Sequence, residues 1–499
     1  MHNYDTIVIG AGLGGLLCAV MLAKEGEKVA VIEQNKQVGG CLQTFSFHKK
    51  IFDSCVHYIG AMDEGQTQRR IFDHAGIAQD LKLRRLDVEG FDSIMLGNDP
   101  MEYRLAQGTD NFVETLAAQF PLQHKGLKAY MEAIEYVADS FPLYKLRLGH
   151  ASEKNRVWHW DMQHVMGNIA DATLRRVLTG NSLLYAGSES TTPFYVHALV
   201  AKNYIDGAWK CEGGSSQIAK LLVRQLREYG GEIIRNTQAQ SAMAKGGSLQ
   251  AVVDQHGERY EAKRFIANAH PAKVIEWMPE GLIKPVYKKR IAAAPNSVAS
   301  FMLNIVLAPG TVAYRNHNIY WTKDGDTLIA DKAAQGEWPL NYALYFTEDP
   351  LRQGFAESVA VLCYMDGGQW DSWGHTRNIT ARPSRRPHDY HACKEAKAAQ
   401  LLHLVAERFP EIKDNLLAMK VASPLTFRDY MGSPDGSMYG IMADVRQPEL
   451  ASIPIRTKIP NLLLTGQNIG IHGVLGVSIN AVAVCSEILG MGYLLGKIN

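Results

Sequence analysis

A glycine-rich turn directly follows a short apolar run at residues 6–9. Gly10 lets the chain leave the expected strand sharply, Gly12 leaves space for a pyrophosphate against the backbone, and Gly15 lets the following helix pack close to the sheet. The free N–H groups and the positive dipole at the start of that helix attract phosphate. An ordinary strand-to-helix turn can carry the same glycines, so the prediction of a dinucleotide site depends on the residues that follow.

Glu33 lies at the end of the next apolar run, residues 29–32. This is about 20 residues after the turn, where an acid accepts hydrogen bonds from ribose hydroxyls. A carboxylate there also repels a 2′-phosphate, which disfavours NADP. The expected strand, turn, helix and second strand follow one another at the spacing of a dinucleotide-binding motif, and the acid lies at the end of the second strand. Residues 1–42 therefore predict a dinucleotide site. The pair Gly39-Gly40 favours FAD over NAD, because it resembles the second glycine turn of flavoproteins with two dinucleotide-binding domains.

A second glycine loop follows a buried apolar run near the C-terminus, at residues 461–466. We expect residues 467–473 to form a loop and residues 474–489 to form a helix of small residues. The start of such a helix can place N–H groups against the flavin pyrimidine edge, although an ordinary strand–helix unit would look the same. The candidate cofactor-binding residues in these motifs are Gly10, Gly12, Gly14, Gly15, Glu33, Gly39, Gly40, Gly466, Gly473 and Val474.

His57 interrupts the apolar stretch at residues 51–60. A histidine titrates near neutral pH and can donate a proton, so His57 is the first candidate for a catalytic acid. A buried core histidine is the alternative. Tyr58 and His472 are weaker candidates for the same role.

Composition excludes several classes of protein. The 499 residues include 52 basic and 51 acidic side chains, a balance that argues against nucleic acid as the main partner. The seven cysteines contain no C-x-x-C pair, which predicts a reducing compartment, no disulfide framework and no metal site. The first expected strand starts within a few residues of Met1, leaving no room for a signal peptide. We therefore expect a cytoplasmic protein; contact with a membrane surface stays open.

The middle of the chain predicts an insertion into the cofactor domain. Residues 110–147 show helical periodicity with Pro121 between two helices, and residues 156–200 predict further helices rich in aromatic residues. These aromatics could form an ordinary packed core, or they could line the wall of an apolar substrate site. The expected parts are FAD-binding residues 1–85, 205–285 and 441–499, and substrate-domain residues 86–204 and 286–440.

The rest of the chain returns to α/β character. Residues 217–229 predict a helix, residues 232–235 a short strand, and residues 248–263 a hairpin followed by a separate strand at residues 265–269. Residues 296–365 predict an antiparallel sheet and residues 395–409 an amphipathic helix. Arg377, Arg382, Arg385 and Arg386 lie around Pro383 in a basic stretch, which predicts a solvated loop or a contact with anionic lipid.

Several stretches together resemble the phytoene-desaturase-like FAD flavoproteins, especially the retinol saturase and carotenoid isomerase branches. The resemblance runs nearly from end to end. It is carried by residues 10–33 with Gly39 and Gly40, residues 52–60, residues 204–209 leading to Gly213 and Gly214, residues 464–467 with Gly473 and Gly476, and residues 424–426 with Tyr430 and residues 439–440.

The resemblance implies a Rossmann-like FAD-binding domain with an inserted α+β substrate domain. It also implies an apolar isoprenoid or polyene substrate, and redox or isomerisation chemistry at a carbon–carbon double bond. By this resemblance Ala239 would give a backbone contact to adenine, and Cys41 and Asn468 would be further cofactor-binding positions. Cys41 stands where relatives often carry a basic or polar residue. Asn468 stands where saturase-like relatives tend to have an acid near the ribityl chain, and an amide can still hydrogen-bond a hydroxyl.

The expected chemistry is transfer of a hydride between flavin and one carbon of the double bond, with an acid protonating the other carbon. The reverse is desaturation, and interruption after the first transfer allows isomerisation. No second nucleotide motif is visible, so the electron donor or acceptor stays open. Two alternatives are a flavin amine oxidase and a non-enzymatic carrier of prenyl lipid resembling GDP-dissociation inhibitor. Residues 467–474 lack a flavin-linking cysteine, and the intact glycine set favours a retained cofactor.

Overall fold

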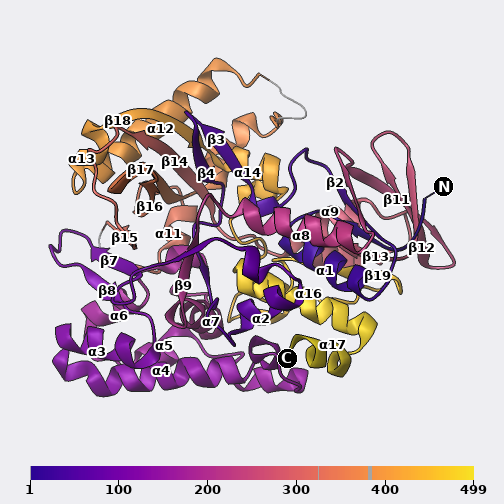
Figure 1. Cartoon of the computed structure of the whole chain (residues 1–499), viewed down its shortest axis with the longest axis horizontal. Helices are drawn as coiled ribbons and strands as arrows, with labels where there is room; N and C mark the ends of the chain where they lie inside the picture. Colours follow the sequence, from indigo (N-terminus) through magenta and orange to yellow (C-terminus); the bar gives the residue numbers. More distant parts are fainter. Residues whose placement is uncertain (1, 324, 380–384) are drawn as a thin grey trace.

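The strands form two large sheets in the computed structural model, which describes residues 2–323, 325–379 and 385–499 (Figure 1). The first sheet lies near the N-terminus and takes its strands from the three segments predicted to bind FAD. The second sheet takes its strands from the two predicted substrate-domain segments. The strand membership fits the predicted α/β architecture, while the domain boundaries themselves stay predictions.

The first sheet has the strand order β10-β2-β1-β13-β12-β11, with β19 paired to β13. Its β10, β2, β1, β13 and β19 run parallel, so their carboxyl ends meet at one edge. The prediction of a separate strand at residues 265–269 was wrong, because β13 runs unbroken from the hairpin into the parallel part of the sheet. The strands are β1 His2–Ile9, β2 Val29–Glu33, β10 Glu232–Arg235, β11 Ala239–Lys245, β12 Ser248–Asp254, β13 Arg259–Ala267 and β19 Leu462–Leu464.

Helix α1 (Leu13–Lys24) lies between α8 (Ser216–Glu228) and α16 (Gly473–Leu489) (Figure 1). Residues 13–23 are all buried, because this helix is apolar on every side and packs against the sheet and both helices. The predicted helices at residues 217–229 and 474–489 are confirmed within one residue at their starts. Helix α17 (Met491–Ile498) follows α16, and α2 (Thr67–His74) packs near both.

The second sheet has the order β18-β14-β17-β16-β15-β7-β8 and is antiparallel except where β15 runs parallel to β7. The predicted sheet at residues 296–365 is thus confirmed, and β7, β8 and β18 extend it. Its strands are β7 Asp92–Leu96, β8 Tyr103–Leu105, β14 Ala299–Leu307, β15 Asn318–Thr322, β16 Asn341–Asp349, β17 Arg352–Met365 and β18 Leu416–Ala422. The small strands are β3 Thr44–Phe47, β4 Lys50–Asp53, β5 Ile59–Gly60, β6 Leu83–Arg85 and β9 Ala208–Cys211.

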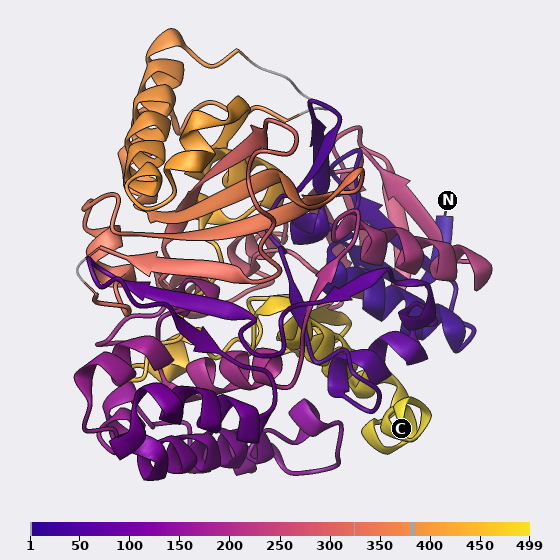
Figure 2. The same cartoon turned by 60° about the vertical axis from the view of Figure 1, so that its left-hand side comes forward.

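The two faces of the second sheet bury different sets of side chains. One face packs against α12 (His388–Ala406), which begins seven residues before the predicted residue 395. The alternate residues face the core shared with the first sheet and the helical insertion. Figure 2 shows the sheet between α12 above and the helices α3 and α4 below. This alternation decides which side chains of the sheet reach the interior between the two domains.

The predicted helical insertion is confirmed. Helices α3 (Thr109–Gln119) and α4 (His124–Asp139) flank Pro121, as expected. No helix in the described part of the chain is both long and apolar enough to cross a membrane. The other helices are α5 Met162–Met166, α6 Ala172–Leu178, α7 Phe194–Ile205, α9 Pro271–Glu276, α10 Pro285–Ala293, α11 Ala330–Ala334, α13 Pro410–Asp414, α14 Pro424–Met431 and α15 Pro448–Ala451.

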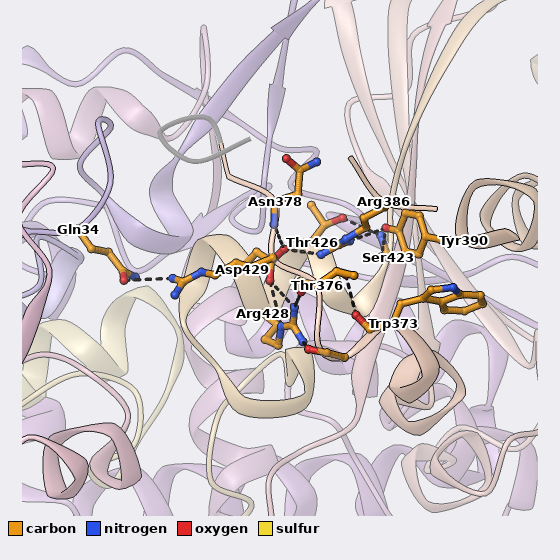
Figure 3. A network of polar contacts seen from close by, with 12 residues as sticks. Gln34, Trp373, Thr376, Asn378, Arg386, Tyr390, Ser423, Thr426, Arg428 and Asp429 are labelled. Atoms are coloured by element: carbon orange, nitrogen blue, oxygen red, sulfur yellow. Dashed lines mark hydrogen bonds and ion pairs between the residues drawn. The ribbon is translucent and has the colours of Figure 1, made fainter. Parts of the chain in front are cut away.

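A buried ion-pair network fixes part of the predicted basic loop (Figure 3). Asp429 on α14 is fully buried and forms ion pairs with Arg386 and, at 2.7 Å, with Arg428. Its Oδ2 also accepts the Asn378 N–H at 2.8 Å. The prediction of a solvated loop is therefore wrong for Arg386, because the Asp429 carboxylate compensates its burial. Arg377 and Arg385 are exposed, and Arg382 and Pro383 lie outside the described residues.

We expect Asp429→Ala to lower the free energy of unfolding by about 3–5 kcal/mol, because it leaves the buried Arg386 without its carboxylate. Urea denaturation of the two proteins measures the difference. Glu487→Gln is the matched control, since the Arg456–Glu487 pair is exposed and its loss should cost less than about 1 kcal/mol. A similar small cost for both variants would contradict the assigned role of Asp429.

Candidate functional site

The first glycine turn has no room for side chains. Gly10 has φ +99°, and a Cβ on it would lie 2.6 Å from the Asn268 carbonyl oxygen. A Cβ on Gly15 would lie 2.2 Å from the Gly10 carbonyl oxygen, and one on Gly12 would lie 2.8 Å from the Asn268 amide nitrogen. The backbones of Gly12 and Gly39 also pair as an isolated parallel β-bridge. The backbone of the turn is therefore left bare, as close contact with a pyrophosphate requires.

The structure brings this turn and the C-terminal glycine loop together. A Cβ on Gly14 would lie 3.3 Å from the Gly466 Cα. A Cβ on Gly466, which has φ +98°, would lie 2.5 Å from the Asn268 Oδ1. Asn268 was not predicted, yet it lies between both loops and donates from Nδ2 to the Gly10 carbonyl at 3.2 Å. A polar residue directly after the apolar end of β13 was the signal that could have found it.

Glu33 lies at the end of β2 beside the turn. One carboxylate oxygen accepts the Ala11 N–H at 2.8 Å, and the other accepts the Asn35 N–H at 2.8 Å. Burial raises the pKa of this carboxyl, while the backbone hydrogen bonds act in the opposite direction. The segment that leads to the buried Ala239 lies alongside, because the Thr237 N–H donates to the Glu33 carbonyl at 2.8 Å. Glu33 and Ala239 thus belong to the same end of the site.

The second glycine turn, at Gly39 and Gly40, leads into a short helical turn. Gly39 has φ +115°, and Gly40–Leu42 form a turn of 3₁₀ helix, so the extended part starts only at Thr44. A Cβ on Gly40 would lie 3.3 Å from the Gly12 Cα, which places the two turns against each other. The Cys41 thiol lies within hydrogen-bonding reach of the Cys55 thiol. All seven cysteines are described and are free thiols.

The C-terminal loop leads into α16 at Gly473, with Val474 half-buried in the first turn. Asn468 is buried, and its Oδ1 accepts the Ile441 N–H at 3.0 Å. His472 precedes the helix and packs on Tyr439, with ring centroids 4.5 Å apart and the ring planes tilted by 32°. Burial lowers the pKa of His472 to about 4, which keeps this ring neutral at physiological pH.

His57 is buried and stacks on Tyr345 with ring centroids 4.1 Å apart. Within the described residues its Nε2 has no hydrogen-bond partner. Burial, aided by the charge of Lys210, lowers the pKa of His57 to about 3. Its imidazole is therefore neutral near pH 7, which weighs against the predicted role as proton donor.

Tyr58 belongs to the same cluster of aromatic side chains as His57 and Tyr345. Its ring stacks on that of Tyr204 with centroids 4.3 Å apart, and its hydroxyl donates to the Asp92 Oδ2 at 3.0 Å. Tyr204 and Tyr345 both influence the pKa of Tyr439, the ring partner of His472. The structure thus brings His57, Tyr58 and, through Tyr439, His472 to one buried aromatic region. Asp92 was not among the predicted site residues.

Comparisons with known proteins show what the chain as a whole resembles. A family model described as an NAD(P)-binding Rossmann-like domain matches residues 8–75. All-trans-retinol 13,14-reductase of Rattus norvegicus is 27% identical, with 98% of this chain and 86% of the relative covered. Phytoene desaturase (lycopene-forming) of Pantoea ananas is 22% identical over 94% of this chain and 96% of the relative. Prolycopene isomerase 1, chloroplastic, of Oncidium hybrid cultivar is 23% identical over 92% and 79%.

The chain is a homologue of these phytoene-desaturase-like proteins. The predicted resemblance is thereby confirmed. Solved structures share the fold: an oxidoreductase from Methanosarcina mazei has a TM-score of 0.65 at 14% identity, covering 97% of this chain and 100% of that one. Putrescine oxidase bound to putrescine has a TM-score of 0.62 at 14% identity, covering 97% and 99%. The predicted Rossmann-like α/β fold is confirmed.

We expect Gly15→Ala to lower both the melting temperature and the amount of bound flavin, because its Cβ would meet the Gly10 carbonyl oxygen at 2.2 Å. Differential scanning calorimetry and the visible absorbance of the purified protein measure the two effects. Gly496→Ala is the control: it lies in α17, and nothing described lies within 4 Å of its Cβ position. That change should be neutral or stabilising by up to about 1 kcal/mol. Equal behaviour of the two variants would contradict a close-packed turn.

We expect His57 to stay neutral between pH 5 and 8, roughly the range in which an unperturbed histidine with a pKa near 6.5 changes its charge. Nitrogen-15 NMR of histidine-labelled protein, with the His57 signal assigned through His57→Gln, measures this directly. A ring that gains its proton between pH 7 and 6 would restore the predicted acid role.

Proposed function

We propose that the protein is an FAD-dependent oxidoreductase that acts on carbon–carbon double bonds of an apolar isoprenoid or polyene. The observation that carries the proposal is similarity over nearly the whole chain to a retinol reductase, a phytoene desaturase and a prolycopene isomerase. By their names, these relatives act on isoprenoid polyenes. The chemistry covers saturation, desaturation and cis/trans isomerisation.

The glycine turn at residues 10–15 leaves its backbone free of large side chains, which suits the binding of FAD. Residues 10–15 would bind the pyrophosphate, Glu33 the ribose, and the backbone of Ala239 the adenine. Gly39, Gly40 and Cys41 would lie along the cofactor from one side, and Asn268 would hold the turn in place. Bound FAD would supply the two-electron exchange with the double bond. The flavin end would be held by Gly466, Asn468, Gly473 and Val474, with the N-terminus of α16 favouring negative charge there.

The residues that face the shared core suit an uncharged substrate. Tyr345, Tyr364 and Tyr439 are neutral at physiological pH, as tyrosines ordinarily are, and burial raises the pKa of each hydroxyl further. His57 and His472 are neutral because burial lowers the pKa of each ring. Such a site favours an apolar chain over an ion. Because an isoprenoid partitions into membranes, we also propose a cytoplasmic protein that takes its substrate from a membrane surface.

Two alternatives are less well supported. The amine oxidase neighbours share the fold at 13–14% identity, a likeness that carries no information on substrate. A carrier without cofactor would have no need for the bare turn that Gly10, Gly12 and Gly15 maintain beside Glu33.

The purified protein is expected to show the visible absorbance of FAD. After anaerobic reduction, it should convert a retinoid or carotenoid to a product that has gained two hydrogen atoms or changed its double-bond geometry. The oxidised protein should remove two hydrogen atoms from a saturated relative. Chromatography with mass spectrometry identifies each product, with cofactor-free protein as the control. A colourless protein that takes up no added FAD would overturn the proposal, and oxidation of an amine in place of a polyene would favour the amine oxidase alternative.

A further inference from the structure

A buried carboxyl group lies at the end of a row of tyrosine hydroxyls. The Tyr58 hydroxyl donates to the Asp92 Oδ2 at 3.0 Å and lies 2.8 Å from the Tyr320 hydroxyl. The Tyr320 hydroxyl lies 3.2 Å from the Tyr345 hydroxyl. Asp92 has no exposed surface, and Tyr58, Tyr320 and Tyr345 are buried as well. The row therefore links the carboxyl to Tyr345 by hydrogen bonds, without bulk water.

Strand register explains why these groups meet. Strand β15 runs parallel to β7 and places Asn318 beside Asp92. Tyr320 follows Asn318 by two residues, so both point to the same face of the sheet. Strand β16 runs antiparallel on the other side of β15 and presents Tyr345 on this face. The sheet thus places Asp92, Tyr320 and Tyr345 on one face. Tyr58, in the segment before β5, lies between Asp92 and Tyr320 and forms a hydrogen bond with each.

The row has one deep end and one end toward the candidate site. At the deep end, Asp92 accepts hydrogen bonds from the side-chain amides of Asn181 at 3.0 Å and Asn318 at 2.9 Å. At the other end, Tyr345 stacks on His57 and influences the pKa of Tyr439, which packs on His472 at the start of α16. Tyr345 therefore connects the row to the aromatic side chains beside the start of α16.

The charge state of Asp92 is adjustable in this environment. Burial raises the pKa of Asp92 to about 6, while the three hydrogen-bond donors act in the opposite direction. The other titratable groups that feel its charge are Tyr58, Tyr204, Tyr320 and Tyr345. Among the described residues no cation contributes to this pKa. Burial keeps the four tyrosines protonated by raising their pKa values.

We propose that Asp92 stores the proton that Tyr345 exchanges with the substrate carbon, with Tyr58 and Tyr320 as the relay between them. This inference rests on the proposed function and deepens it by assigning the acid. In saturation, Tyr345 gives its proton to the carbon that does not receive hydride and takes one from Tyr320. Tyr320 takes one from Tyr58, and Tyr58 takes one from the Asp92 carboxylic acid. The substrate gains one proton, Asp92 becomes a carboxylate, and every tyrosine keeps its hydroxyl. Desaturation runs the same steps backwards.

With Asp92 ionised, as after proton delivery, the Tyr58 hydroxyl donates to its carboxylate. A protonated Asp92 would reverse that hydrogen bond and orient the row toward Tyr345. Asp92 acts through Tyr345, so the tests must separate proton supply from simple support of the fold.

The first test is the pH dependence of turnover by the FAD-loaded enzyme. In the saturation direction kcat should fall about tenfold per pH unit above pH 6, as Asp92 loses its proton before the step. In the desaturation direction kcat should instead fall below pH 6. Asp92→Asn should lower kcat about 100-fold, leave KM unchanged and remove the limb of the pH profile in which kcat falls above or below pH 6. Tyr345→Phe and Tyr320→Phe should lower kcat to a similar extent.

Tyr342→Phe is the matched control. Tyr342 lies on the same strand as Tyr345 but faces α12, and its hydroxyl has no hydrogen-bond partner in the described ranges. This variant should keep the kcat and the pH profile of the original enzyme. An Asp92→Asn enzyme that retains the limb near pH 6 while the original turns over polyenes would overturn the relay and leave the proposed function intact.

The second test needs no substrate. Infrared difference spectra of the protein between pH 5 and 7 should show the loss of a buried carboxylic acid band, and Asp92→Asn should lack that band. The absence of such a titration in the original protein would overturn the proposal, even if no polyene were converted. Failure of all polyenes to react, with the band present, would instead overturn the proposed function alone.

Discussion

The close approach of bare backbone at the carboxyl edge of the first sheet is the constraint on which the rest of the structure depends. Parallel strands bring the ends of β2, β1, β13 and β19 to one edge, where Asn268 lies between the turn at Gly10 and the loop at Gly466. A side chain at either glycine would collide with Asn268. Because these segments are separated by more than 400 residues in sequence, the site exists only when the whole first sheet has formed. The substrate-domain segments are therefore inserted between parts of the chain that meet again at the carboxyl edge of the first sheet.

The sequence predicted what depends on local pattern. The strand at residues 232–235 and the helices on either side of Pro121 follow from periodicity and from helix-stopping residues, and both were correct. The prediction of a dinucleotide cofactor was drawn from the Gly10 motif and Glu33, because their spacing reflects a fixed backbone geometry. The continuity of β13 was missed, since only its pairing with strands distant in sequence shows that it does not break.

The rest of the candidate site could not be predicted, because it depends on burial and on contacts distant in sequence. His57 was a reasonable acid candidate, but the ring of Tyr345, 288 positions later in the numbering of the chain, covers it and burial lowers its pKa to about 3. Arg386 belongs to a basic stretch that the sequence alone assigns to a solvated loop, but in the structure it is buried and paired with Asp429. Asp92 carries no local motif, and its partner Asn318 reaches it only through the pairing of β15 with β7. Each case shows a side chain whose chemistry is set by a neighbour distant in sequence.

The row of hydroxyls also bears on the direction of the chemistry. Saturation and desaturation each exchange one proton as well as one hydride with the substrate, whereas isomerisation returns every hydrogen that it borrows. In isomerisation the proposed relay would give a proton and take it back, so only saturation and desaturation change the number of protons that it holds. Burying a carboxyl without a cation beside it costs free energy, and such groups are retained mainly where they serve function. Asp92 is fully buried and connected by hydroxyls to Tyr345, and through this connection the proposed relay would supply the net proton of saturation or remove that of desaturation.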